Sequence, residues 1–89
     1  MAKMLVHHKV KDFNAWKAVY DSVFDIRKAN GEQTDQIFHE ENDPNSLTII
    51  FDWDSFENAR KYAGSPELKA AMEKAGVLGP PDIHFITEA

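Results

Sequence analysis

The sequence predicts an α+β domain in which a four-stranded antiparallel sheet is covered by helices on one face. Three observations support this fold class. Residues 47–53 (LTIIFDW) form the most apolar run and are rich in β-branched and aromatic residues, as expected of a central strand. A cluster of turn formers at 42–45 separates this run from a more polar arm, which predicts a hairpin. Apolar residues at helical spacing lie on either side of this hairpin.

The first half of the chain predicts a strand and a helix. In the strand at residues 4–10, alternation places four side chains on one face: Met4, Val6, His8 and Val10. Asp12 is a good N-cap for a helix that begins at Phe13, and apolar residues then recur with a helical rhythm as far as Phe24. We expect one amphipathic helix of about five turns, ended by Asn30 and Gly31.

The predicted hairpin joins two different strands. Residues 33–41 are polar, so we expect an edge strand. The central strand at 47–53 alternates, and one face carries its most apolar side chains: Leu47, Ile49, Phe51 and Trp53. Its other face carries Thr48, Ile50 and Asp52.

The last third predicts two short helices and a strand. Asp54 or Ser55 caps the first helix, and Gly64 interrupts it. Ser65 as N-cap and Pro66 at the first helical position begin the second helix, which Gly76 ends. The Gly-Pro-Pro segment at 79–81 is then expected as an extended linker before a final strand at 82–88.

The resulting order, β-α-β-β-α-β, is that of the ferredoxin-like fold in a single domain spanning residues 1–89. In this arrangement the first and third strands are central and both helical segments cover one face. The other face then exposes Ile50 and its neighbours to water unless another subunit covers them. A homodimer that packs sheet to sheet is therefore expected.

Length and composition favour the same conclusion. A chain of 89 residues buries only ~60–65% of its unfolded surface, and the absence of cysteine removes disulfides as reinforcement. No stretch approaches the ~20 apolar residues of a membrane span, and the first residues lack the apolar run of a signal peptide. We expect a cytoplasmic protein without membrane partners. Ten basic and fifteen acidic residues, a net charge of −5, argue against nucleic acid as a partner.

Several segments resemble a known family. They are Val10 to Phe13 followed by Trp16, the Asp-Pro pair at 43–44, residues 65–69 (SPELK) and residues 75–81 (AGVLGPP). Together they resemble the antibiotic biosynthesis monooxygenase-like family of the dimeric α/β-barrel superfamily, whose members are often labelled only as provisional cyclases or as proteins of unknown function. The matching segments span nearly the whole chain, but they are caps and turns that carry no chemistry.

The resemblance implies two ferredoxin-like subunits that pack their sheets into a barrel, each with a small pocket between sheet and helices. Its superfamily includes cofactor-free oxygenases of polyketide phenols, isomerases and haem-degrading enzymes, so the fold alone does not select a reaction. The helix that would carry the haem-ligating His in the haem-degrading members has none here. No cofactor is therefore expected.

Two residues are candidate catalytic groups. All four histidines fall in predicted strands, and His8 is the preferred acid–base candidate because imidazole titrates near neutral pH. Asp52 follows Phe51 in the central strand. Its carboxylate is either partly buried, with a raised pKa that suits a general base, or fully solvated at the end of the strand. If Asp52 met a histidine, the pair could remove a phenolic proton and leave an electron-rich carbanion for oxygen.

Three further residues are candidates for binding a small, aromatic or polyketide-like molecule: His39, Trp53 and His84. Trp16 and Tyr20 have helical spacing and are expected in the core. A metal site built from strand histidines lacks any recognised local spacing, so none is expected. The alternative to an enzyme is a non-catalytic ligand-binding or assembly module, in which the open sheet face serves dimerisation only.

Overall fold

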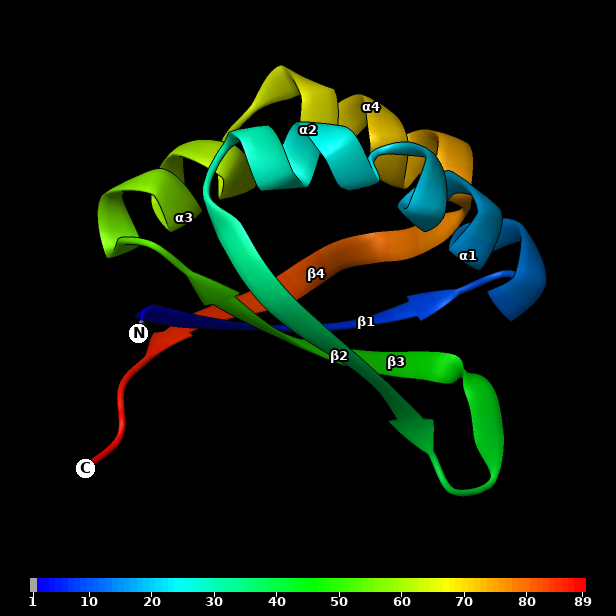
Figure 1. The fold of residues 1–89 in the computed structure, drawn as a ribbon. Coiled ribbons are helices and arrows are strands. Elements are labelled where there is room, and N and C mark those ends of the chain that lie inside the picture. Colours follow the sequence, from blue (N-terminus) through cyan, green and yellow to red (C-terminus); the bar gives the residue numbers. More distant parts are fainter. Residues whose placement is uncertain (1) are drawn as a thin grey trace.

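The computed structural model describes residues 2–89, which fold into one antiparallel sheet with helices over one of its faces (Figure 1). The elements follow in this order: β1 (Ala2–Val10), α1 (Phe13–Ser22), α2 (Phe24–Ala29), β2 (Glu32–Glu40), β3 (Asp43–Trp53), α3 (Phe56–Ala63), α4 (Pro66–Ala75) and β4 (Val77–Ile86).

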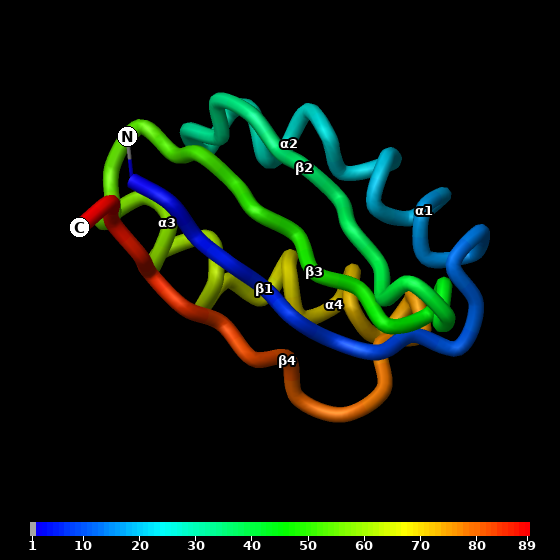
Figure 2. The backbone as a smooth tube through the Cα atoms, turned by 90° about the horizontal axis from the view of Figure 1, so that it is seen from below, coloured from blue at the N-terminus to red at the C-terminus, as the bar shows by residue number. Residues whose placement is uncertain are grey.

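The strand order in the sheet is β2-β3-β1-β4, and each neighbouring pair is antiparallel. Figure 2 shows the sheet from its uncovered side, with the helices behind it. The predicted ferredoxin-like fold is therefore confirmed, with β1 and β3 at the centre and β2 at an edge.

The helix-covered face of β1 and β3 forms the core. Side chains that alternate toward the helices are buried in both strands: Ala2, Met4, Val6, His8, Val10, Leu47, Ile49, Phe51 and Trp53. The two strands pair in register, so that Val6 lies opposite Ile49 and Met4 opposite Phe51. Apart from the buried Ser46, side chains on the opposite faces of these strands are half-buried or exposed, as expected of a sheet with helices on one side only.

The predicted single helix after β1 is in fact two helices, α1 and α2, separated at Val23. Two side chains bond to carbonyls at this break. The Ser22 hydroxyl donates to the Val19 carbonyl at 2.6 Å, a contact that bends helices, and the Arg27 guanidinium donates to the Tyr20 carbonyl at 2.6 Å. The break places Val23 against the cavity described below.

Two strand boundaries also differ from prediction. β3 begins at Asp43, so the tight turn is Glu41 and Asn42 rather than residues 42–45. β4 begins at Val77 and ends at Ile86, so the Gly-Pro-Pro segment is part of the strand rather than a linker before it. An edge strand tolerates prolines because one side of its backbone needs no partner, and the register with β1 shifts at this point.

Candidate functional site

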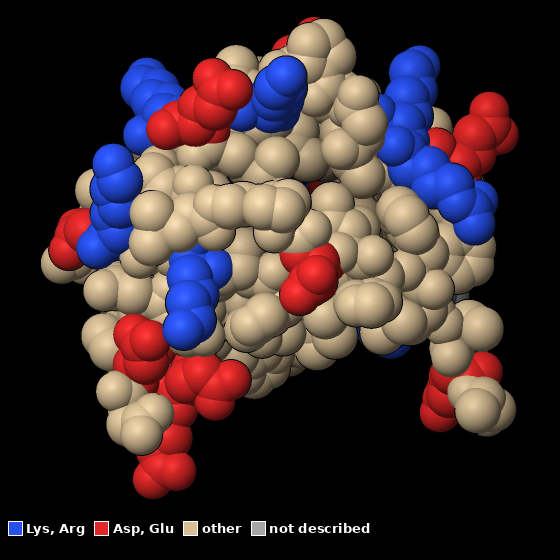
Figure 3. All heavy atoms as spheres, turned by 180° about the vertical axis from the view of Figure 1, so that it is seen from behind, with Lys and Arg blue, Asp and Glu red and all other residues tan. Residues whose placement is uncertain are grey.

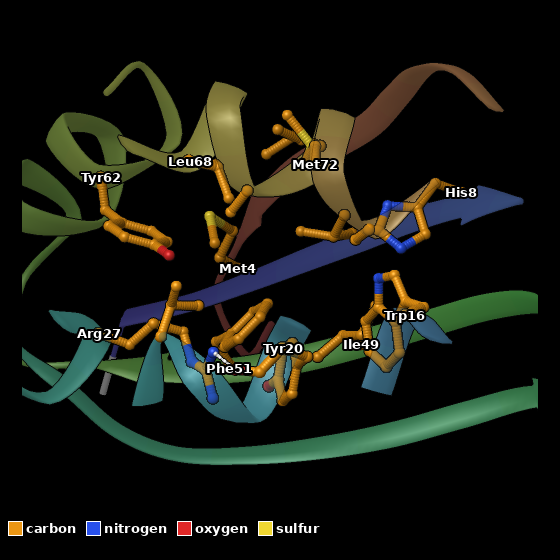
Figure 4. Close-up of a pocket in the computed structure, with 15 residues that line it drawn as sticks. Met4, His8, Trp16, Tyr20, Arg27, Ile49, Phe51, Tyr62, Leu68 and Met72 are labelled. Carbon is orange, nitrogen blue, oxygen red and sulfur yellow. Dashed lines mark hydrogen bonds between the residues drawn. The ribbon is translucent and has the colours of Figure 1, made fainter. Parts of the chain in front are cut away.

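A cavity lies between the helix-covered face of the sheet and the helices (Figure 4). Its volume is about 60 Å³, which is several times the roughly 10–15 Å³ that a single water needs. Most of its walls are apolar side chains, among them Met4, Val6, Ile49, Leu68, Met72 and Ile83. The two methionines are flexible and polarisable, so the cavity can adapt to an apolar guest.

One wall of the cavity is aromatic. Trp16 and Tyr20 from α1 stack with ring centroids 4.7 Å apart, and Phe51 lies 6.4 Å from Tyr20. Trp16 is buried as predicted, with 3% of its surface exposed. The rings of Trp16 and Tyr20 also face the cavity, which was not predicted. Helical spacing alone does not distinguish these two positions.

His8 is the polar group of β1 that faces this cavity. Its ring meets Trp16 edge to face at 5.9 Å, and neither ring nitrogen has a hydrogen-bond partner within residues 2–89. Burial, with a smaller contribution from the neighbouring His7, lowers the pKa of His8 to about 4. The imidazole is therefore neutral at pH 7 and has one donor and one acceptor available to a guest.

A buried ion pair lies at another part of the cavity wall, and sequence reasoning missed it. Arg27 lines the cavity with 2% of its surface exposed, and its Nε donates to Glu32 Oε1 at 2.9 Å. Lys28 approaches the other Glu32 oxygen at 3.3 Å. Burial raises the pKa of Glu32, while the Arg27 charge opposes that rise. The sequence signal for this pair is an arginine at a position that continues the apolar stripe of the predicted helix, where its aliphatic stem alone would suffice to explain it.

Tyr20 is fixed by two polar contacts, one at its hydroxyl and one over the face of its ring. Its hydroxyl donates to Asp35 of β2, and the Arg27 guanidinium carbon lies 3.7 Å from its ring centroid. Burial, followed by the hydrogen bond with Asp35, raises the pKa of Tyr20 above its ordinary value. These contacts hold the aromatic wall in one orientation.

Asp52 lies on the uncovered face of the sheet, so within one chain it does not share a site with His8. Its carboxylate accepts from Lys3 and from Thr34, both at 2.6 Å. The hydrogen bond from Lys3 makes the largest contribution to lowering the pKa of Asp52, and the one from Thr34 adds to it. The expectation of a raised pKa is wrong, because a cation and a hydroxyl stabilise the charged form where burial was expected to destabilise it.

The other candidate residues do not gather around the cavity. Trp53 is completely buried and packs between Phe51 and Tyr62, with ring centroids 6.3 and 5.3 Å away. His39 is exposed near the end of β2, and its Nδ1 donates to the Glu40 carbonyl at 2.6 Å. His84 is exposed on β4, opposite Leu5. Within residues 2–89, no group of three or more His, Cys, Asp or Glu side chains is placed to hold a metal ion.

The surface carries charges of both signs. Figure 3, a view from behind, shows lysines and arginines mainly in the upper part, over the helical layer, with acidic residues both among them and near the lower corners, and no broad basic patch on this face. None of the helices in residues 2–89 has the length and apolar character needed to cross a membrane.

A four-stranded sheet covered on one side by helices, with an apolar cavity between the layers, defines a ferredoxin-like protein with a potential small-molecule site. No family model matches the chain, and neither does any curated protein. A Bordetella bronchiseptica protein, provisionally assigned as an antibiotic biosynthesis monooxygenase, has a similar structure, with a TM-score of 0.81 and 14% identity over 99% of this chain and 96% of that one.

Two other solved structures give comparable matches. SnoaB, a cofactor-independent oxygenase from Streptomyces nogalater, has a TM-score of 0.75 and 12% identity over 99% of this chain and 94% of that one. A conserved protein from Methanosarcina mazei has a TM-score of 0.76 and 15% identity over 100% of this chain and 94% of that one. Many of the structural neighbours are antibiotic biosynthesis monooxygenases, which confirms the resemblance to that family at the level of the fold.

Proposed function

We propose that this protein binds a small aromatic molecule in the cavity and oxygenates it without a cofactor, with His8 as the acid–base group. The observation that carries the proposal is a buried, neutral imidazole without a hydrogen-bond partner in residues 2–89, facing an otherwise apolar and aromatic cavity. A buried polar group in such a place is satisfied by a guest, and stacked rings suit a flat one. The structural similarity to SnoaB supports the reaction class by analogy of fold.

His8 supplies the proton transfer in this proposal. Its free nitrogen accepts the proton of a phenolic hydroxyl, and the electron-rich carbanion that remains reacts with oxygen. The lowered pKa of His8 makes it a weak base before the guest binds. A phenolate formed beside the ring favours the imidazolium and raises that pKa during the reaction, because an opposite charge at short range stabilises the charged form.

We also propose that two chains form a homodimer through their uncovered sheet faces. That face presents Leu5 and Ile50 from the central strands, with the exposed side chains of Phe38 and Ile86 on the two edge strands. A small domain with apolar side chains on an open sheet gains burial by association. Asp52 and His84 would then lie at the subunit interface, away from the cavity within their own chain.

The test uses 1-naphthol, whose oxidation by one molecule of oxygen gives 1,4-naphthoquinone and water. Binding is followed by tryptophan fluorescence, and turnover by oxygen uptake together with quinone absorbance. We expect the His8→Asn variant to bind 1-naphthol within a few-fold of the wild type but to turn over about a hundredfold more slowly or worse, since general base catalysis contributes that much.

His7→Asn is the matched control, because His7 is the next residue on the same strand and faces the other side of the sheet. Asn can retain a hydrogen bond to Thr48, so this variant should keep its turnover. Full oxygen uptake by His8→Asn would refute the catalytic role. Binding of 1-naphthol with no oxygen uptake by the wild type would favour the non-catalytic binding module.

A further inference from the structure

The cavity has a second polar end, formed by Tyr62 and Arg27. Tyr62 of α3 is 4% exposed, and its hydroxyl has no hydrogen-bond partner within residues 2–89. Figure 4 shows this hydroxyl directed into the cavity. This oxygen is not among the fully enclosed unpaired polar atoms of residues 2–89, so it is open to the cavity and available to a guest.

Arg27 also has a donor to spare. Its Nε donates to Glu32 and its Nη1 to the Tyr20 carbonyl, but its Nη2 has no hydrogen bond to any of residues 2–89. Burial raises the pKa of Tyr62, and the Arg27 charge opposes that rise, as expected of two groups at the same end of one cavity. Both groups therefore offer N–H or O–H donors to the guest.

His8 lies at the other end of the aromatic wall. Trp16 is 5.9 Å from the His8 ring, Tyr20 stacks on Trp16 at 4.7 Å, and Arg27 lies 3.7 Å above the Tyr20 ring centroid. Two stacked rings thus separate the imidazole from the guanidinium, and the labelled side chains follow this order in Figure 4. A guest that reaches both ends must be elongated and flat.

The charge of the second end limits what it can bind. Two cations, Arg27 and Lys28, face Glu32, and a second carboxylate, Asp35, accepts from the Tyr20 hydroxyl nearby. The two positive charges are thus already matched by two negative ones, and a carboxylate guest would add an unmatched negative charge. A neutral carbonyl oxygen accepts hydrogen bonds without adding that charge. The second end is therefore suited to a ketone or quinone oxygen rather than to an acid.

We propose that Tyr62 and Arg27 are specificity-determining residues that donate to a carbonyl oxygen of the guest, at the end of the ring system opposite the hydroxyl bound by His8. This inference rests on the proposed function, because it takes the cavity as the binding site. It adds that the guest has two polar ends, a hydroxyl and a carbonyl, joined by a fused-ring body.

Two probes of the same size test the proposal. The first, 6-hydroxy-1-tetralone, has a phenolic hydroxyl and a carbonyl at opposite ends of two fused rings. The second, 5,6,7,8-tetrahydro-2-naphthol, lacks only the carbonyl. We expect calorimetry to show about tenfold tighter binding of the tetralone to the wild type, the effect of one or two hydrogen bonds.

The Tyr62→Phe variant should bind the tetralone only about threefold tighter than the tetrahydronaphthol or less, and its affinity for the tetrahydronaphthol should not change. Arg27→Lys keeps the charge beside Glu32 but removes the fork of donors, and should reduce the preference in the same way. Equal affinity of the wild type for both probes would overturn this inference and leave the proposed function standing. Binding of neither probe would overturn both.

Discussion

The imidazole of His8 is held in its neutral form by its surroundings. It belongs to the buried face of β1, where hydration of the cation is lost, and no carboxylate is hydrogen-bonded to either ring nitrogen within residues 2–89. The pKa of about 4 is well below that of a free histidine, near 6.5. A group that stays neutral in the native state but ionises when unfolded makes stability depend on pH.

Acid should destabilise the native protein through His8. Between about pH 6.5 and pH 4 the unfolded chain protonates His8 and the native chain does not, so the stability held above pH 6.5 is lost as pH falls toward the native pKa of about 4. The pKa difference corresponds to roughly 3 kcal/mol. The measurement is the free energy of unfolding in urea at several pH values, for the wild type and for His8→Phe.

His8→Phe keeps a buried ring without a titrating group, so it isolates this contribution from that of the carboxylates. The stability difference between the two proteins should change by about 3 kcal/mol in favour of the variant as the pH drops from 7 to 4. Parallel curves for the two proteins would show that His8 titrates normally in the native state.

His8 and Asp52 lie on opposite faces of the sheet. Because successive side chains of a strand alternate between its two faces, His8 shares one face of β1 with Met4 and Val6. In β3, Asp52 is on the face that does not carry Ile49 and its apolar neighbours. Since the helices must cover the apolar faces of both strands, the sequence already contained enough information to place the two residues on different sides. The ion pair between Asp52 and Lys3 could not be predicted, because it depends on the register of β1 with β3.

At the scale of elements, the two glycines that end α3 and α4 have different roles. Gly76 has a left-handed backbone, with φ of 79°, and its N–H donates to the Met72 and Glu73 carbonyls near the end of α4. Gly64 ends α3 with φ of −95°, which any residue adopts. Both glycines have room for a methyl group, with the nearest atoms 3.6 Å from an added Cβ. Backbone conformation is thus the main difference between them.

This difference predicts opposite effects of the same substitution. Gly76→Ala should lower the free energy of unfolding by about 1–2 kcal/mol, the cost of a left-handed residue with a side chain. Gly64→Ala should be neutral or stabilise the protein by up to about 1 kcal/mol, because it reduces the entropy of the unfolded chain. Urea unfolding of both variants is the measurement, and equal effects would contradict the assignment of Gly76 as a helix cap.

Some strands and helix caps can be predicted from the sequence, whereas the break between α1 and α2 cannot. The central strand and the edge character of β2 follow from apolar patterning, and caps such as Ser65 are visible as single residues. The break at Val23 is not visible, because no glycine or proline marks it and the bonds that accompany it come from Ser22 and Arg27. The prolines at 80 and 81 suggested a linker although they belong to β4. A strand tolerates them at the edge of a sheet, and only the order of strands shows that β4 is at an edge.

At the scale of the whole molecule, the order of elements was sufficient to predict the fold, because few topologies satisfy β-α-β-β-α-β with one apolar helix-covered face. The cavity was not predictable in the same way. Its walls come from aromatic side chains of α1, the buried Arg27 and residues of five other elements, so the cavity depends on how these side chains pack rather than on a pattern along the chain. The candidates chosen by residue type alone therefore included only one group, His8, that lines it.

The uncovered sheet face is the surface through which we expect two chains to associate. Ile50 lies at the centre of β3, paired with Leu5 of β1 and Gln36 of β2, and its side chain is directed away from the helices. If two such faces pack together, the Ile50→Lys variant places an unpaired ammonium in the middle of the interface, at a cost of several kcal/mol. We expect native mass spectrometry to give twice the chain mass for the wild type and the single chain mass for this variant.

Ala18→Lys, on the exposed side of α1, is the control and should remain a dimer. A wild-type protein that is monomeric at tens of micromolar would refute the sheet-to-sheet dimer, while the cavity and its two polar ends, which lie on the other side of the sheet, would remain as described.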